Sequence, residues 1–220
     1  MLASDMENAR FNMIEQQIRP CEIIDPRVLD TLKSVPRERF VGETYQGLAF
    51  ADVHVPLSGE NTMMKPMQEG VMLQALDVHE GDRVLEVGTG SGFITACLLE
   101  LGGKVTSYEI DPELSALAAQ RLADLGISGA ELVVGDIFDA DLPHAGYDVI
   151  AVTGSLPMPS ERLEQLLAPG GRMFMIHGED PVMQASLVTR SPDGQLHSEN
   201  LCETLLPPLQ NAPHPARFTF

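Results

Sequence analysis

The chain has 220 residues, of which 44% are hydrophobic, and this is enough to fill one substantial core. Its 32 acidic and 14 basic residues give a net charge of -18, which opposes binding to nucleic acid and to anionic membrane surfaces. The opening residues lack the apolar core of a secretory signal, and no later run approaches membrane-spanning length, so we expect a cytoplasmic protein. The three cysteines lie far apart without CxxC spacing, and we expect no disulfide and no metal site.

Residues 1–80 form the first predicted unit, a helical cap followed by an active-site loop. The stretches ENARFNMIEQQI and DPRVLDTLKSV have helical apolar spacing, and Pro20 and Pro36 end them. The stretch ADVHVPLSGENTMMKP is predicted to be an irregular loop. Because the helices are short, we expect the cap to depend on docking against the rest of the chain.

Residues 81–220 form the second predicted unit, in which β-rich runs alternate with amphipathic stretches. Helices are expected at 91–102, 111–126 and 160–171, each ended by a glycine. This alternation predicts an α/β fold with a doubly wound, mainly parallel, Rossmann-like sheet. Its first five strands are expected at 83–87, 104–110, 131–136, 147–154 and 172–178.

The C-terminal part departs from this rhythm. The runs VMQASLVTR and LHSENLCETLL flank SPDGQ, a turn-forming sequence that can join antiparallel strands. The hairpin brings the predicted sheet to seven strands. Nicotinamide-binding domains usually continue with a parallel sixth strand, whereas methyltransferases that use S-adenosylmethionine carry a reversed final strand.

The stretch VLEVGTGSGF places Gly88, Gly90 and Gly92 directly after the first strand. A GxG turn between a strand and a helix lets a cofactor approach the backbone and the helix N-terminus. The dinucleotide fingerprint requires glycine or alanine at position 93, where this chain has Phe93, and its ring would obstruct a pyrophosphate. The turn therefore favours another adenosine-bearing cofactor.

Three carboxylates lie at the carboxyl ends of successive predicted strands. Glu109 can accept hydrogen bonds from both ribose hydroxyls, Asp136 can accept one from an adenine amino group, and Glu86 can face a methionine ammonium group. Because ligands of open α/β sheets bind at the carboxyl ends of the strands, we expect these residues to share one adenosine site.

The order of these motifs resembles the protein-L-isoaspartate O-methyltransferase family over roughly residues 10–180. The matching segments are QQIRPCEIIDPRVLDTLKSVPRERFV, TMMKP, VLEVGTGSGF, the GD at 135–136 and LLAPGGRMFMIHG. The resemblance implies that S-adenosylmethionine is the cofactor, S-adenosylhomocysteine the product, and an isoaspartyl residue of a damaged protein the methyl acceptor, which starts repair. The cofactor would contact Glu86, Gly88, Thr89, Gly90, Ser91, Gly92, Glu109, Ile110, Asp136 and Ile137.

The chain departs from the family pattern at TMMKP, the last part of the predicted loop. The family reads TIS where this chain has TMM, so Thr62 is kept but Met64 replaces the serine whose hydroxyl orients the substrate. Thr62, Met64 and Lys65 are therefore the candidate catalytic positions. The family also often has tyrosine at Phe93 and glycine at Ile137, and the segment beyond residue 180 does not follow its pattern.

A carboxylate acceptor is ionised at pH 7 and needs no general base, so the lack of a Ser/His/Asp arrangement is no objection. His54 and His177 are further candidates near the acceptor. Four function classes are compatible with the chain: a protein carboxyl methyltransferase, a small-molecule methyltransferase, a nicotinamide oxidoreductase and a non-catalytic module that binds S-adenosylmethionine. The methyltransferase with an isoaspartyl protein or peptide as partner is the leading interpretation, with a small-molecule acceptor as its alternative.

Overall fold

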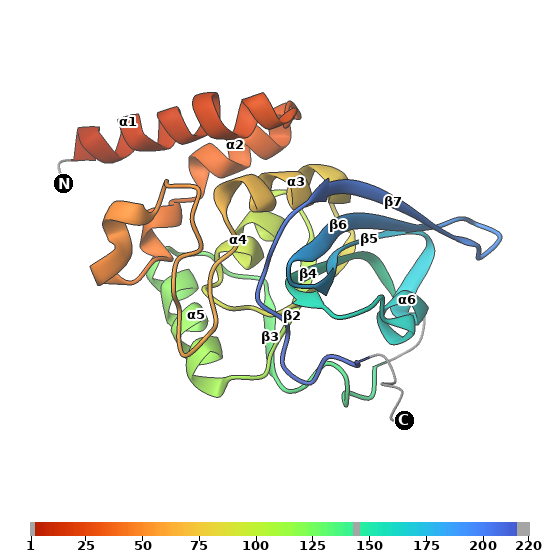
Figure 1. Ribbon diagram of the computed structural model, residues 1–220. Helices are drawn as coiled ribbons and strands as arrows, with labels where there is room; N and C mark the ends of the chain where they lie inside the picture. The colour runs from red at the N-terminus through yellow and green to blue at the C-terminus, as the bar shows by residue number, and fades with distance from the viewer. Residues whose placement is uncertain (1–2, 143–145, 215–220) are drawn as a thin grey trace.

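A computed structural model describes residues 3–142 and 146–214, and its centre is one seven-stranded sheet (Figure 1). The strand order is β3-β2-β1-β4-β5-β6-β7. The strands are β1 (Arg83–Val87), β2 (Lys104–Glu109), β3 (Glu131–Val134), β4 (Tyr147–Leu156), β5 (Leu167–Glu179), β6 (Val182–Arg190) and β7 (Leu196–Glu203).

The first five strands are parallel, and the last two form the predicted antiparallel hairpin. Strand β1 pairs with both β2 and β4, β2 pairs with β3, and β4 pairs with β5, all in parallel. Strand β6 then runs antiparallel to β5 and to β7. This mixed order confirms the predicted methyltransferase-type sheet, and it brings the carboxyl ends of β1, β2, β3 and β4 to one edge.

The expected helix at 160–171 is wrong in its second half. Helix α6 spans Glu161–Leu166, and β5 begins at Leu167. Leu167 pairs with Tyr147, and the next pair joins Arg172 to Val149, so the residues between them form a bulge. Leu167 and Ala168 are buried in the sheet. These apolar residues fit a strand as well as a helix, and in the structure they belong to β5.

Helix α3 (Pro66–Leu76) lies within the first predicted unit and was not predicted from the sequence. Pro66 occupies its first turn, and the amide of Lys65 donates to Gln68 Oε1 at 2.8 Å. The predicted helices are α1 (Ala3–Met13), α2 (Pro26–Ser34), α4 (Phe93–Glu100) and α5 (Pro112–Asp124); a π-helix (Ile14–Ile18) and 3-10 turns (Arg19–Cys21, Arg37–Arg39 and Glu43–Leu48) complete the N-terminal part.

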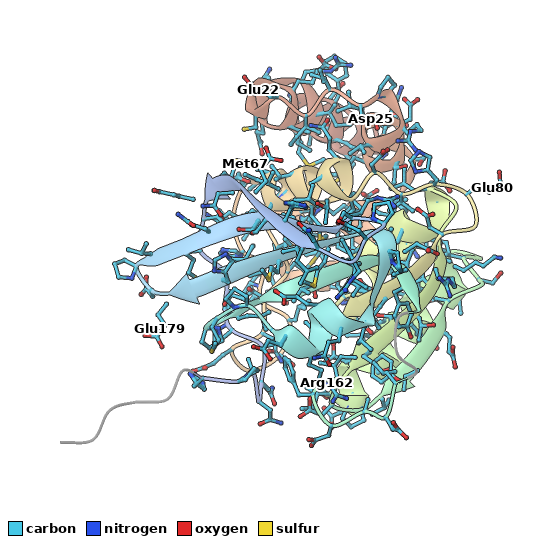
Figure 2. All side chains as sticks on the ribbon, turned by 90° about the vertical axis from the view of Figure 1, so that its right-hand side faces the viewer. Glu22, Asp25, Met67, Glu80, Arg162 and Glu179 are labelled. Atoms are coloured by element: carbon cyan, nitrogen blue, oxygen red, sulfur yellow. The ribbon has the colours of Figure 1, made fainter. Side chains whose placement is uncertain are left out.

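The cap rests on the sheet through α3. Figure 1 shows α1 and α2 above α3, and Figure 2 places Glu22 and Asp25 of the cap above Met67 at the start of α3. Ile18 and Leu32 of the cap belong to the same buried apolar cluster as Val84 of β1 and Phe174 of β5. This continuity is the reason to propose that residues 1–80 are a docked cap on the unit formed by residues 81–220.

The opposite face of the sheet has a second apolar cluster. Leu85, Ile150 and Met173 of the sheet pack there with Leu163 of α6. Figure 2 shows α6, marked by Arg162, on the side of the sheet away from the cap. Helices on both faces match the doubly wound prediction. Among residues 3–142 and 146–214, no helix is long and apolar enough to cross a membrane, and no cluster of side chains could hold a metal ion.

Candidate cofactor and acceptor site

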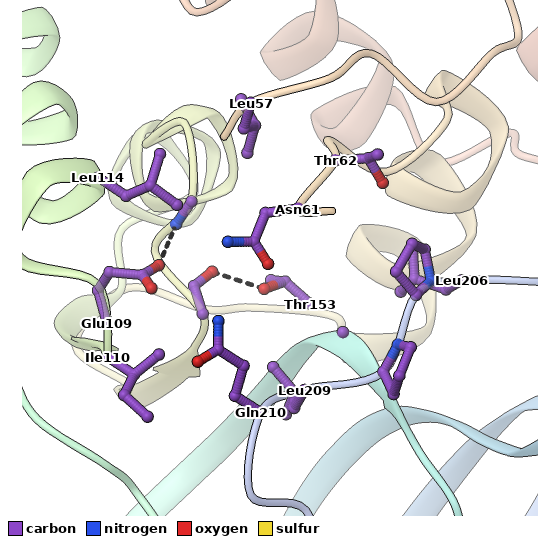
Figure 3. Close-up of a pocket in the computed structure, with 15 residues that line it drawn as sticks. Leu57, Asn61, Thr62, Glu109, Ile110, Leu114, Thr153, Leu206, Leu209 and Gln210 are labelled. Carbon is purple, nitrogen blue, oxygen red and sulfur yellow. Dashed lines mark hydrogen bonds between the residues drawn. The ribbon is translucent and has the colours of Figure 1, made fainter. Parts of the chain in front are cut away.

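A cleft lies at the carboxyl ends of the central strands, around the turn that follows β1. Figure 3 shows Glu109 and Ile110 on one side of it, Leu57 and Thr62 of the acceptor loop on another, and the C-terminal segment on the third. The loop consists of residues 57–65, and we call it the acceptor loop. The cleft continues under this loop as an acceptor subpocket, lined by Leu57, Thr62, Met63, Met64, Glu69, Gly88, Thr89, Gly90, Ser91, Phe93, Ile94 and Thr153.

Two of the predicted glycines open their backbone toward the cleft. Gly88 has a φ of 95°, and a Cβ there would lie 2.5 Å from Thr153 Oγ1. Its carbonyl accepts a hydrogen bond from that hydroxyl at 2.5 Å (Figure 3). Gly90 also lines the cleft, whereas Gly92 packs against α5, where a Cβ would lie 3.2 Å from the Cβ of Ala118. A side chain at Gly88 would therefore both strain the turn and fill the site.

Glu109, at the end of β2, combines two structural contacts with exposure to the cleft. Its Oε2 accepts from the amide of Gly90 at 2.8 Å, and its Oε1 accepts from the amide of Asp111 at 3.1 Å. A carboxylate has about four acceptor positions, so two remain for a ligand. The turn and this carboxylate are thereby held in fixed relation before any ligand binds.

Asp136 follows β3 and lines a neighbouring part of the cleft with Ile110 and Ile137. Its Oδ1 accepts from the amide of Phe138 at 2.8 Å, and its Oδ2 accepts from Asn211 Nδ2 at 2.8 Å. Asn211 thus presents an amide NH₂ group to the carboxylate that was predicted to receive an adenine amino group. Each oxygen of Asp136 therefore already has one donor within the chain, and a contact with an adenine amino group stays a prediction.

Glu86 lies deeper than predicted. Its side chain is 0% exposed and does not line the cleft, and its Oε2 accepts from Thr95 Oγ1 at 2.5 Å. The hydroxyls of Thr89 and Ser107 share a hydrogen bond of 2.6 Å, and Glu86 Oε1 has no hydrogen-bond partner among the described residues. Burial raises the pKa of Glu86 to about 7, against the opposing effect of the neighbouring hydroxyls. A contact with a methionine ammonium group stays a prediction.

The acceptor loop places its three candidate residues differently. Thr62 lines the cleft, and its Oγ1 is buried without a hydrogen-bond partner among residues 3–142 and 146–214. Met64 lines the acceptor subpocket and is 3% exposed, so its side chain packs into the wall. Lys65 does not line the cleft among the described residues. It is the N-cap residue of α3, and its amide donates to Gln68. Of the three candidates, Thr62 is the one with a hydroxyl, and its contact with a ligand stays a prediction.

The two histidine candidates have structural partners. The Nδ1 of His54 lies 3.2 Å from the carbonyl of Met63, and its Nε2 lies 3.1 Å from the carbonyl of Leu205, so this ring bridges the acceptor loop and the C-terminal segment. The Nε2 of His177 lies 3.0 Å from Ser186 Oγ on the neighbouring strand, and partial burial lowers its pKa. Neither ring is among the described residues that line the cleft.

The C-terminal segment, residues 204–212, forms part of the site, and sequence reasoning missed it. Ser155 at the end of β4 anchors it, because its amide donates to Pro207 O at 2.9 Å and its carbonyl accepts from the amide of Leu209 at 2.9 Å. Leu209 lies over Gly154, because a Cβ added to Gly154 would lie 2.6 Å from Leu209 Cδ2. The segment has no periodic pattern, and LPPL is the signal that could have marked an extended chain beside β4.

Comparison with known proteins identifies a family to which the chain is similar. The family model described as protein-L-isoaspartate(D-aspartate) O-methyltransferase matches residues 8–213. A protein of that name from Aeropyrum pernix is 37% identical over 94% of this chain and 81% of its own length. Another from Pelobacter propionicus is 36% identical over 94% and 93%. The match includes the C-terminal segment, so the expectation that the resemblance ends near residue 180 is wrong.

Solved structures agree on the fold. A Plasmodium falciparum structure described as a protein-L-isoaspartate O-methyltransferase in complex with S-adenosyl-L-homocysteine has a TM-score of 0.77 at 20% identity, covering 93% of this chain and 98% of that one. A second structure of the same description has a TM-score of 0.78 at 22% identity and covers 94% and 66%. With its sequence relatives and its fold in agreement, the chain belongs to the protein-L-isoaspartate (D-aspartate) O-methyltransferase family.

Proposed function

We propose that the chain transfers a methyl group from S-adenosylmethionine to the carboxylate of an isoaspartyl residue in damaged proteins or peptides. The observation that carries this proposal is the placement of Thr62. Thr62 lines the same cleft as Gly88 and Glu109, and its buried hydroxyl has no hydrogen-bond partner among residues 3–142 and 146–214. Gly88 and Glu109 have the open backbone and the free carboxylate positions that an adenosine cofactor needs. Family membership supports the reaction class.

The residues present fit the cofactor. Glu109 would accept from the ribose hydroxyls, Asp136 would accept from the adenine amino group, and the backbone of Gly88 and Gly90 would pass beneath the ligand. Ile110 and Ile137 would pack against the adenine ring, because both line the part of the cleft next to Asp136. Thr89 and Ser91 line the acceptor end. When bound, S-adenosylmethionine supplies an electrophilic methyl group on a sulfonium and leaves as S-adenosylhomocysteine.

The chain's own task is to orient the acceptor and to exclude water. An isoaspartyl carboxylate is ionised at neutral pH, so no residue has to remove a proton. Thr62 Oγ1 would donate one hydrogen bond to that carboxylate and fix its direction. This bond replaces the solvation that a buried carboxylate loses, and it holds the other oxygen in line with the donor.

The chain has Met64 where the family has a serine, and this changes the chemistry of the subpocket wall. The Met64 side chain is buried in the wall of the acceptor subpocket beside Leu57 and Met63, so the wall at this point is apolar. We propose that Thr62 carries the orienting role alone and that isoaspartyl transfer is correspondingly slow. The same apolar wall favours, as a second candidate, an acceptor whose reactive oxygen is attached to an apolar small molecule.

Thr62→Val and Thr62→Ser test the role of this hydroxyl. Valine has nearly the shape of threonine but cannot donate, and loss of an oriented hydrogen bond in a catalytic site costs roughly a hundredfold to a thousandfold in rate. Serine keeps the hydroxyl and should retain most of the activity. The measurement is kcat/KM for methyl transfer to an isoaspartyl peptide. Equal values for Thr62→Val and wild type would remove Thr62 from the reaction.

We propose a cytoplasmic enzyme that acts on proteins or peptides and binds neither nucleic acid nor membranes. The net charge of -18 supports both exclusions, since phosphate groups and anionic lipids would be repelled. A filter-binding titration with duplex DNA at low salt, in which no retention is expected, tests the first of them.

A further inference from the structure

Behind the acceptor subpocket lies a buried arginine that the reaction itself does not use. Arg37 belongs to the 3-10 turn Arg37–Arg39 of the cap and is 0% exposed. Its Nε donates to Glu69 Oε2 at 2.8 Å, and its Nη2 donates to Glu69 Oε1 at 3.0 Å. Glu69, on α3, is 1% exposed, so the pair is a fully buried bidentate ion pair.

The remaining donors of Arg37 reach two other segments. Its Nη2 also donates to the carbonyl of Met64 at 2.8 Å, and its Nη1 donates to the carbonyl of Ala49. The guanidinium carbon lies 5.5 Å from the centroid of the Phe93 ring at the start of α4. One side chain therefore joins the cap, the acceptor loop, α3 and α4.

The residues that Arg37 contacts are themselves part of the acceptor subpocket. Met64, Glu69 and Phe93 all line it together with Thr62. Only Met63 lies between Thr62 and Met64 in the chain, so a fixed Met64 carbonyl limits how far the Thr62 hydroxyl can move. A buried ion pair is not in itself a strong source of stability, because desolvation offsets most of the attraction. Its geometry, by contrast, defines one position for each group that it bonds.

We propose that Arg37 is the positioning residue of the acceptor loop, holding the Met64 carbonyl so that Thr62 faces the methyl donor. This inference rests on the proposed function for its kinetic consequence, whereas the position of the loop is a property of the protein alone. Lysine cannot replace arginine here, because a single ammonium group cannot bond both oxygens of Glu69 and the two carbonyls in one plane.

The test compares Arg37→Lys with Arg172→Lys. Arg172 is a matched control because it also bonds a carboxylate, Asp82, at 2.7 Å and the carbonyls of Leu76 and Asp77 at the far end of α3. Amide hydrogen exchange of the acceptor loop, residues 57–65, and calorimetric binding of S-adenosylhomocysteine can both be measured without a methyl acceptor. In Arg37→Lys we expect exchange of this segment to rise at least tenfold while the Kd for S-adenosylhomocysteine changes less than threefold. Arg172→Lys should leave both unchanged.

Kinetics then link the loop to the reaction. With an isoaspartyl peptide, Arg37→Lys should lower kcat/KM at least tenfold at saturating cofactor, with unchanged KM for S-adenosylmethionine. A peptide that neither the wild type nor Met64→Ser methylates would refute the proposed function, yet the exchange data would still decide the role of Arg37. Unchanged loop exchange in folded Arg37→Lys, or an equal loss of cofactor affinity, would overturn the inference. If Arg37→Lys does not fold, Glu69→Gln replaces it as the test variant. Faster amide exchange of the acceptor loop in folded Glu69→Gln would support the positioning role of Arg37, and unchanged exchange would overturn it.

Discussion

Replacing Glu109 by alanine tests the cofactor half of the site. Glu109 is 6% exposed, and its carboxylate bonds the amides of Gly90 and Asp111 at 2.8 and 3.1 Å while facing the cleft. The variant loses the charged acceptor that the ribose would use and also loosens the turn. A hydrogen bond to a charged group contributes about 1.5 to 3 kcal/mol, so the affinity for S-adenosylhomocysteine should fall roughly 10- to 150-fold.

Isothermal titration calorimetry with S-adenosylhomocysteine measures this loss directly. Glu113→Ala is the matched control, because Glu113 is an exposed glutamate in the first turn of α5 and does not line the cleft among the described residues. Circular dichroism shows whether both variants are folded. An affinity of folded Glu109→Ala within twofold of the wild type would refute the assignment of Glu109 to the cofactor site.

Three further predictions concern stability and the turn. Because the pKa of Glu86 is raised to about 7, the folded state holds its proton between about pH 4.5 and pH 7, and the free energy of unfolding should fall by about 3 kcal/mol as the pH rises through this window. Urea unfolding of Glu86→Gln should lack this fall, and the same pH slope in both proteins would contradict it. Gly88→Ala should weaken S-adenosylhomocysteine binding more than tenfold by calorimetry, because Gly88 has a φ of 95° and its new Cβ would lie 2.5 Å from Thr153 Oγ1. The control Gly47→Ala, which has open space around its Cβ, should leave the affinity unchanged. An isolated fragment of residues 1–80 should show no cooperative unfolding transition, and a cooperative one would refute the docked cap.

The parallel part of the fold was predictable because its signals are local. Strand β1 was predicted at 83–87 and spans Arg83–Val87. A helix was predicted at 111–126, and Asp111 caps α5 there by accepting from the amides of Glu113 and Leu114. Buried apolar runs between glycine turns specify such strands without any information from distant residues. The same periodicity could not distinguish the end of α6 from the start of β5, since both are apolar.

The site was predictable where it follows from strand ends and unpredictable where distant segments meet. Glu109 is the last residue of β2 and Asp136 lies just beyond β3, and both face the cleft because parallel strands bring their carboxyl ends together. Asn211 reaches Asp136 from 75 residues away in the chain, and Arg37 reaches Met64 from 27 residues away. Neither contact has a local pattern. Glu86 was placed at the correct strand, but its fully buried position depends on how α4 packs.

The acceptor is the central claim, and the chemical stability of the product identifies it. The wild-type protein is incubated with S-adenosylmethionine radiolabelled in its methyl group and with two peptides that differ only in an isoaspartyl or a normal aspartyl linkage. Methyl esters release methanol in mild base, whereas N-methyl and ether products do not. We predict base-labile label on the isoaspartyl peptide and none on its aspartyl isomer, with a rate that rises in Met64→Ser. No label on either peptide in the wild type and in Met64→Ser, while S-adenosylhomocysteine still binds, would contradict the proposed function.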